Sequence, residues 1–67
     1  MQMIDQLKDG QTKAFAKHCF ESSTPEELDA VSEGVADQAQ MEHWGITEGQ
    51  WEEAVAAALA DHKAQAN

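Results

Sequence analysis

The stretch from Ile46 to Trp51 constrains the fold most strongly, because it specifies the start of a helix in three ways. Thr47 is a favoured N-cap residue whose hydroxyl can accept from the backbone N–H of Gln50. The side chain of Gln50 can accept in turn from the N–H of Thr47, which completes a capping box. Ile46 and Trp51 flank the cap as the two halves of a hydrophobic staple. The sequence therefore predicts a helix that begins at Glu48.

The residues after this start carry one apolar stripe at helical spacing. A single helix from Glu48 to about Ala64 is predicted by the stripe Trp51, Ala54, Val55, Ala58, Leu59 and His62. The alanines at 56, 57 and 60 lie on the other side, where a solvated helix usually carries charges. They indicate either simple helix propensity or a surface of small residues that permits close packing of helices.

A second helix start is encoded by Thr24, Pro25 and Glu27. Thr24 is the expected N-cap, proline suits the first helical position, and Glu27 closes a capping box. We expect this helix to run to Gly45, a suitable left-handed residue to end it. One face is predicted to meet the core with Leu28, Val31 and Val35, and the nearly opposite face carries Ala30, Gly34, Met41 and Trp44.

The first segment, residues 2–21, also has helical periodicity, with Ile4, Leu7, Phe15 and Cys19 on one face. Gly10 interrupts the pattern at a cost of about 1 kcal/mol in a helix interior, so two short helices joined near Gly10 are the alternative. The predicted fold is all-α: residues 1–67 form a single helical domain, a small bundle of three principal helices or four short ones, without a sheet.

The large apolar residues available for a core are few. With 67 residues and one cysteine, the chain is near the lower size limit for a stable core, and Cys19 alone cannot form an internal disulfide. Self-association, for example as a homodimer, or a partner is the expected supplement. The expected core consists of Ile4, Leu7, Phe15, Phe20, Leu28, Val31, Val35, Trp44, Ile46, Trp51, Val55 and Leu59.

The charge is strongly negative and unevenly distributed. Thirteen acidic residues and four lysines give a formal net charge of −9, and no lysine or arginine lies between His18 and His62. Such a surface repels phosphates and anionic membranes, and it favours a protein partner with a basic surface. The chain has no apolar run of membrane-spanning length and no signal-peptide pattern, so we expect a cytoplasmic protein.

The sequence Gly45-Ile46-Thr47-Glu48 resembles the turn of helix-turn-helix proteins, many of which are repressors that bind DNA. Such proteins place basic or polar residues early in the second helix, where they contact phosphates and bases. Glu48, Glu52 and Glu53 occupy that region here. We therefore expect no direct binding to nucleic acid, and a helix-turn-helix arrangement that serves packing alone.

No residue pattern indicates a catalytic or metal site. His18, Cys19, His43 and His62 lack the spacings typical of zinc ligands. A nucleophile needs a base and an orienting group, and no such set is apparent. We expect no enzyme activity, no catalytic residues, no cofactor and no metal.

The leading hypothesis is a non-enzymatic protein that acts through protein–protein binding, as a regulator or inhibitor of the type carried by phages and mobile elements. Its partner would bind an exposed apolar patch on the second helix. The candidate partner-binding residues are Ala30, Gly34, Met41 and Trp44.

Two alternatives remain open. An acidic mimic of DNA or RNA would block a nucleic-acid-binding protein with carboxylates on one continuous exposed face; its candidates are Glu26, Glu33, Asp37, Glu52, Glu53 and Asp61. A structural or assembly subunit that forms a homo-oligomer is the third hypothesis.

Overall fold

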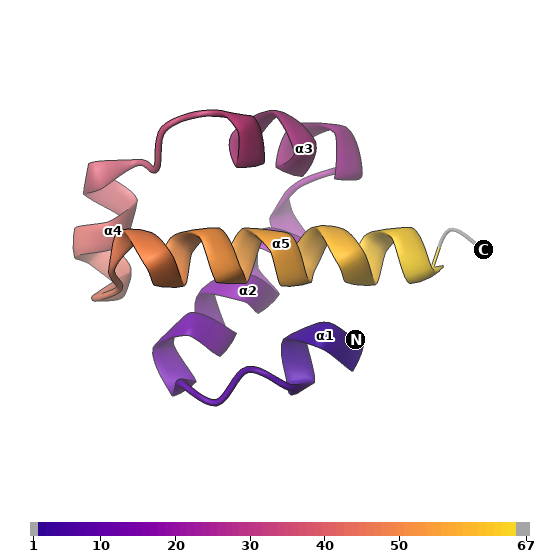
Figure 1. Ribbon diagram of the computed structural model, residues 1–67, viewed down its shortest axis with the longest axis horizontal. Coiled ribbons are helices and arrows are strands. Elements are labelled where there is room, and N and C mark those ends of the chain that lie inside the picture. The colour runs from indigo at the N-terminus through magenta and orange to yellow at the C-terminus, as the bar shows by residue number, and fades with distance from the viewer. Residues whose placement is uncertain (1, 66–67) are drawn as a thin grey trace.

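The computed structural model describes residues 2–65, and this part of the chain is all-α. It contains five helices and no strand, and none of the helices is long and apolar enough to cross a membrane. In chain order the helices are α1 (Gln2–Asp5), α2 (Gly10–Ser22), α3 (Pro25–Glu33), α4 (Gln38–Trp44) and α5 (Glu48–Gln65), as Figure 1 shows.

Helix α5 begins as its sequence predicts. The N–H of Gln50 donates to Thr47 Oγ1 at 3.2 Å, and the N–H of Thr47 donates to Gln50 Oε1 at 2.7 Å. Ile46 and Trp51 are both buried in the core, with 7% of each residue exposed. The capping box is thus confirmed, and both residues of the predicted staple are buried.

The helices are arranged around α5. In Figure 1, α5 crosses in front of α2, α3 runs along one side of it and α1 lies on the other side. Helices α1, α2 and α3 each pack against α5, and α4 packs against α2. The Cα atoms extend only 17 Å along the viewing direction, which accommodates about two layers of helices. Within residues 2–65, no third layer covers the outward face of α5.

The first segment forms two helices rather than one. Helix α1 ends at Asp5 and α2 begins at Gly10. The carboxylate of Asp9 caps α2, because it accepts from the N–H and from the hydroxyl of Thr12, both at 2.9 Å. These hydrogen bonds hold the pKa of Asp9 below its ordinary value. The prediction of one continuous helix over residues 2–21 was wrong, and the alternative of two helices with a break near Gly10 is confirmed.

The second segment is also divided. Its predicted start is confirmed, since Thr24 and Glu27 form the reciprocal hydrogen bonds of a capping box. The continuous helix to Gly45 was wrong, because Gly34 ends α3 in an extended conformation (φ −96°, ψ −170°). Asp37 then caps α4 by accepting from the N–H of Gln40 at 3.1 Å. Gly45 ends α4 in the left-handed conformation (φ 66°), as predicted.

The break between α3 and α4 changes the core. Val31 and Val35 were expected to be buried, but their exposed fractions are 38% and 95%. Ala57, expected on the outer side of α5, is buried instead, on the side of that helix where α1 lies. The other predictions for the core hold: Ile4, Leu7, Phe15, Leu28, Ile46, Trp51 and Val55 are buried, and Phe20, Trp44 and Leu59 are partly buried against them.

Asp61 corrects a second expectation. It was assigned to an exposed acidic face, but only 2% of it is exposed. Its Oδ1 accepts from the N–H of Met3 at 2.8 Å and its Oδ2 from the N–H of Ile4 at 3.0 Å. These N–H groups belong to the N-terminal turn of α1, where they lack partners within the helix. Asp61 therefore ties α1 to α5 across the whole length of the sequence.

We predict that Trp51→Ala destabilises the protein by about 3–5 kcal/mol, because it removes a large buried ring. The ring centroid lies 4.9 Å from that of Phe15 in the core. The measurement is urea denaturation followed by circular dichroism. Val35→Ala is the control, since its side chain is exposed and its midpoint should match that of the parent. A Trp51→Ala protein as stable as this control would contradict the assignment.

We further predict that Asp61→Ala costs about 1–3 kcal/mol, because the N–H groups of Met3 and Ile4, one partly buried and one buried, lose their acceptors. Hydrogen exchange should accelerate at the amides of Met3 and Ile4 more than at the centre of α5. Asp5→Asn, a change at an exposed carboxylate, is the control. Unchanged exchange at these two amides would show that Asp61 does not hold α1.

Candidate functional site

A groove lies between α3, the loop that follows it and the N-terminal half of α5. Its volume is about 380 Å³, and we call it the α3–α5 groove. Residues from the loop and the last turn of α3 form one wall, and residues of α5 form the other. The groove is lined by Val31, Ser32, Gly34, Val35, Ala36, Glu48, Trp51, Glu52, Val55 and Ala56.

The apolar wall of this groove is exposed because α3 ends early. Gly34 turns the chain away from the helix axis, so Val35 lies in the loop with 95% of its surface exposed. Val31, one turn earlier, keeps 38% of its surface exposed. Both line the groove together with the half-buried Ala36. Apolar residues gathered in this way on a surface are typical of an interaction site.

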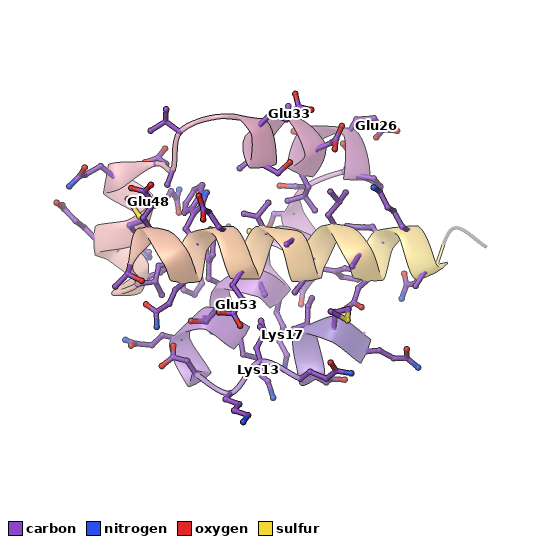
Figure 2. All side chains as sticks on the ribbon, viewed as in Figure 1. Lys13, Lys17, Glu26, Glu33, Glu48 and Glu53 are labelled. Carbon is purple, nitrogen blue, oxygen red and sulfur yellow. The ribbon has the colours of Figure 1, made fainter. Side chains whose placement is uncertain are left out.

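Carboxylates lie on the α5 wall of the groove. Glu48 and Glu52 line it from α5. Figure 2 shows Glu26, Glu33 and Glu48 on one side of the molecule, with Lys13 and Lys17 on the opposite side of α5. The electrostatic potential at the groove is therefore negative, and no lysine or arginine in the sequence between His18 and His62 offsets it.

A second groove lies on the other side of α5, where α1 packs. This α1–α5 groove has a volume of about 470 Å³ and is lined by Met3, Gln6, Leu7, Glu53, Ala56, Ala57 and Ala60. Ala56 lines both grooves, so they are neighbours across the outward face of α5. Within residues 2–65, the exposed large hydrophobic residues are Met3, Val31 and Val35, and each lines one of these grooves.

The residues predicted to bind a partner do not share one helix face. Met41 and Trp44 lie on α4, Ala30 lies on α3 and Gly34 ends α3. Met41 and Trp44 are half-buried, and the Trp44 ring lies 5.6 Å from the Phe15 ring, between centroids. Gly34 alone of the four lines the α3–α5 groove. The continuous helix on which this set relied is absent, and the exposed apolar surface lies beside α5 instead.

The residues predicted to form an acidic mimic face are only partly together. Glu26, Glu33, Asp37 and Glu52 are exposed on α3, on the loop after it and on α5. Glu53 is exposed too, but it lines the groove on the opposite side of α5. Asp61, the sixth member, is buried under α1 as described above.

Cys19 and His62 both pack within the fold. Cys19 is 7% exposed, and burial raises the pKa of its thiol to about 11. His62 Nε2 lies 2.9 Å from the carbonyl oxygen of Phe20, to which it donates, and its ring stacks on Phe20 with 4.2 Å between centroids. Among residues 2–65, no group of three or more His, Cys, Asp and Glu could hold a metal ion. His62 thus closes the C-terminal turn of α2.

The sequence contains a signal for the helix break that forms this groove, but the hydrophobic periodicity across the break predicts a continuous helix. Gly34 is a poor helix former, and Asp37 followed by Gln40 is the spacing of an N-cap with its N3 residue. Together they predict an end and a new start. The apolar pattern from Leu28 to Val35 favoured one continuous helix and concealed this break.

The raised pKa of Cys19 leads to a prediction about its reactivity. Because thiolates react and thiols do not, the folded protein should react with a disulfide reagent at pH 8 on the order of a hundredfold more slowly than the protein in 6 M guanidinium. The ordinary pKa of 9.0 applies to the unfolded chain, so stability should also fall as the pH rises above about 9. Equal reaction rates in the two states would contradict the burial of this thiol.

Comparison of the chain with protein-family models, with curated proteins and with solved structures finds no match in any of the three.

Proposed function

We propose that this protein is a non-enzymatic binding protein, a regulator or inhibitor, which recognises a protein partner with a basic surface through the α3–α5 groove. One observation carries the proposal. Val35 is 95% exposed in an apolar groove lined by Glu48 and Glu52. This combination supplies both an apolar anchor point and an electrostatic preference for a partner.

The apolar part of the groove provides the affinity. Fully burying a valine side chain contributes roughly 1.5–3 kcal/mol. Val35 has almost its whole surface available for this purpose, and Val31 has more than a third. A partner that places an apolar side chain between them packs above Val55 and Trp51, the buried core residues that line the groove from α5. The groove therefore supplies apolar area that a bound partner buries.

The charges select the partner. Carboxylates near the groove attract lysine and arginine side chains, which accelerates association and excludes acidic partners. The net charge of −9 acts in the same direction over a longer range. It opposes a second copy of the chain, because two such molecules repel each other.

Acidic mimicry of nucleic acid is the second candidate. It is favoured by the side of the molecule on which Glu26, Glu33 and Glu48 appear together in Figure 2. A mimic acts through its carboxylates and has no need of an exposed Val35. A substitution at Val35 therefore separates the two functions, and the homo-oligomer hypothesis is separated from both by light scattering.

The test replaces Val35 with glutamate. The partner is first captured from cells by the parent protein, purified, and shown to bind the parent protein again. We expect Val35→Glu to abolish this binding or to weaken it at least about tenfold. The new carboxylate lies in the apolar groove, where it prevents an apolar side chain of the partner from packing. Ala14→Glu adds the same charge at an exposed position of α2 outside both grooves, and it should bind like the parent. Isothermal titration calorimetry measures both affinities.

Two results would contradict the docking proposal. If Val35→Glu binds the purified partner as tightly as Ala14→Glu does, the groove is not the binding site. If affinity is lost instead when Glu26 and Glu33 are changed to glutamine, with Val35 intact, acidic mimicry is the better description.

A further inference from the structure

The two grooves together have the form of a seat for a helix. The α3–α5 groove and the α1–α5 groove lie on either side of α5 and share Ala56. Side chains of a helix that lies along α5 project to both sides, because residues three and four apart point in different directions around the axis. One helix can therefore fill both grooves at once, whereas an extended segment follows only one of them.

The outward face of α5 permits a close approach. Its exposed stripe begins with Glu52 and Glu53, continues with Ala56 and the half-buried Ala60, and ends at the exposed Lys63. The methyl groups of alanine allow two helix axes to come within about 8 Å. The exposed Met3 and Val35 stand beside this stripe, one in each groove, where they can contact the flanks of a docked helix.

The charges determine what kind of helix fits. Glu48, Glu52 and Glu53 line the grooves at the N-terminal half of α5. A docked helix needs cationic side chains beside these carboxylates and apolar side chains above the alanines. A second copy of this chain would present the same carboxylates and a net charge of −9, so it is a poor occupant.

We infer that the occupant of this site is a cationic amphipathic helix of a partner protein, which lies along the outward face of α5 and fills both grooves. This inference rests on the proposed docking function and specifies its partner. The grooves extend along α5 from Glu48 to Ala60. At a rise of about 1.5 Å per residue, this length corresponds to a partner helix of about three to four turns.

The probe is a synthetic peptide of about 14 residues with leucines on one helical face and lysines elsewhere. Its control is a permuted peptide of the same composition, in which the leucines are distributed around the helix. We expect the amphipathic peptide to become helical on binding and to bind at least about tenfold more tightly than the permuted one. In ¹⁵N spectra, the largest shifts should occur at the amides of Met3, Val35, Ala56 and Ala60.

A charge-adding variant separates docking from general attraction. Ala56→Glu makes the protein more acidic, so general attraction to lysines becomes stronger, while docking across Ala56 is blocked. We expect Ala56→Glu to remove the preference for the amphipathic peptide and Ala14→Glu to keep it. Ala56 is exposed, so the thermal melt of Ala56→Glu should match that of the parent.

Equal affinity for the two peptides, or equal preference in Ala56→Glu and Ala14→Glu, would overturn the inference. A stable dimer of the free protein in light scattering would also overturn it, because a second copy would then be the occupant. If Val35→Glu weakens binding of the captured partner but Ala56→Glu does not, the helix inference fails and the proposed function stands. If Val35→Glu has no effect on that partner, the proposed function itself fails.

Discussion

The burial of one long helix supports the rest of this structure. Trp51, Ala54, Val55 and Ala58 are buried along α5, and α1, α2 and α3 each pack against that helix. The shorter helices have few contacts with one another. Helices of four to thirteen residues are also marginal in isolation, so these helices depend on their packing against α5. The capping box at Thr47 has a central role for this reason, because it fixes where α5 begins and hence where every other helix must pack.

The packing of the shorter helices leaves one face of α5 uncovered. Residues 2–65 supply enough helix for about two layers, and among them no third layer encloses α5. A solvated face of this kind usually carries charges along its whole length. Here carboxylates stand at its beginning and Lys63 near its end, and Ala56 and Ala60 lie between them beside two apolar grooves. The uncovered face is thus suited to contact with another helix more than to contact with water alone.

Local signals in the sequence predicted the helix starts at Thr24 and Thr47, whereas contacts between residues far apart in the sequence could not be predicted. The starts at Thr24 and Thr47 depend on hydrogen bonds between residues three apart, so their sequence suffices. The break at Gly34 was missed because the apolar pattern through Val35 continues the helical period, which concealed the N-cap at Asp37. The burial of Asp61 was beyond such reasoning, because its partners are the N–H groups of Met3 and Ile4, 58 and 57 positions away.

The break at Gly34 also explains how an apolar surface persists on so acidic a protein. A helix continued through residue 35 would have carried Val35 on the face of Leu28 and Val31, toward the core, where its burial would stabilise the monomer. The chain instead ends α3 at Glu33 and holds Val35 in the loop, where it contributes almost no buried area. Single exposed apolar residues are common on proteins. Val35 shares its groove with Val31, and Met3 lies across α5 from both, so the exposure is concentrated on one face. The partner proposed above would bury apolar area that the monomer leaves exposed on this face.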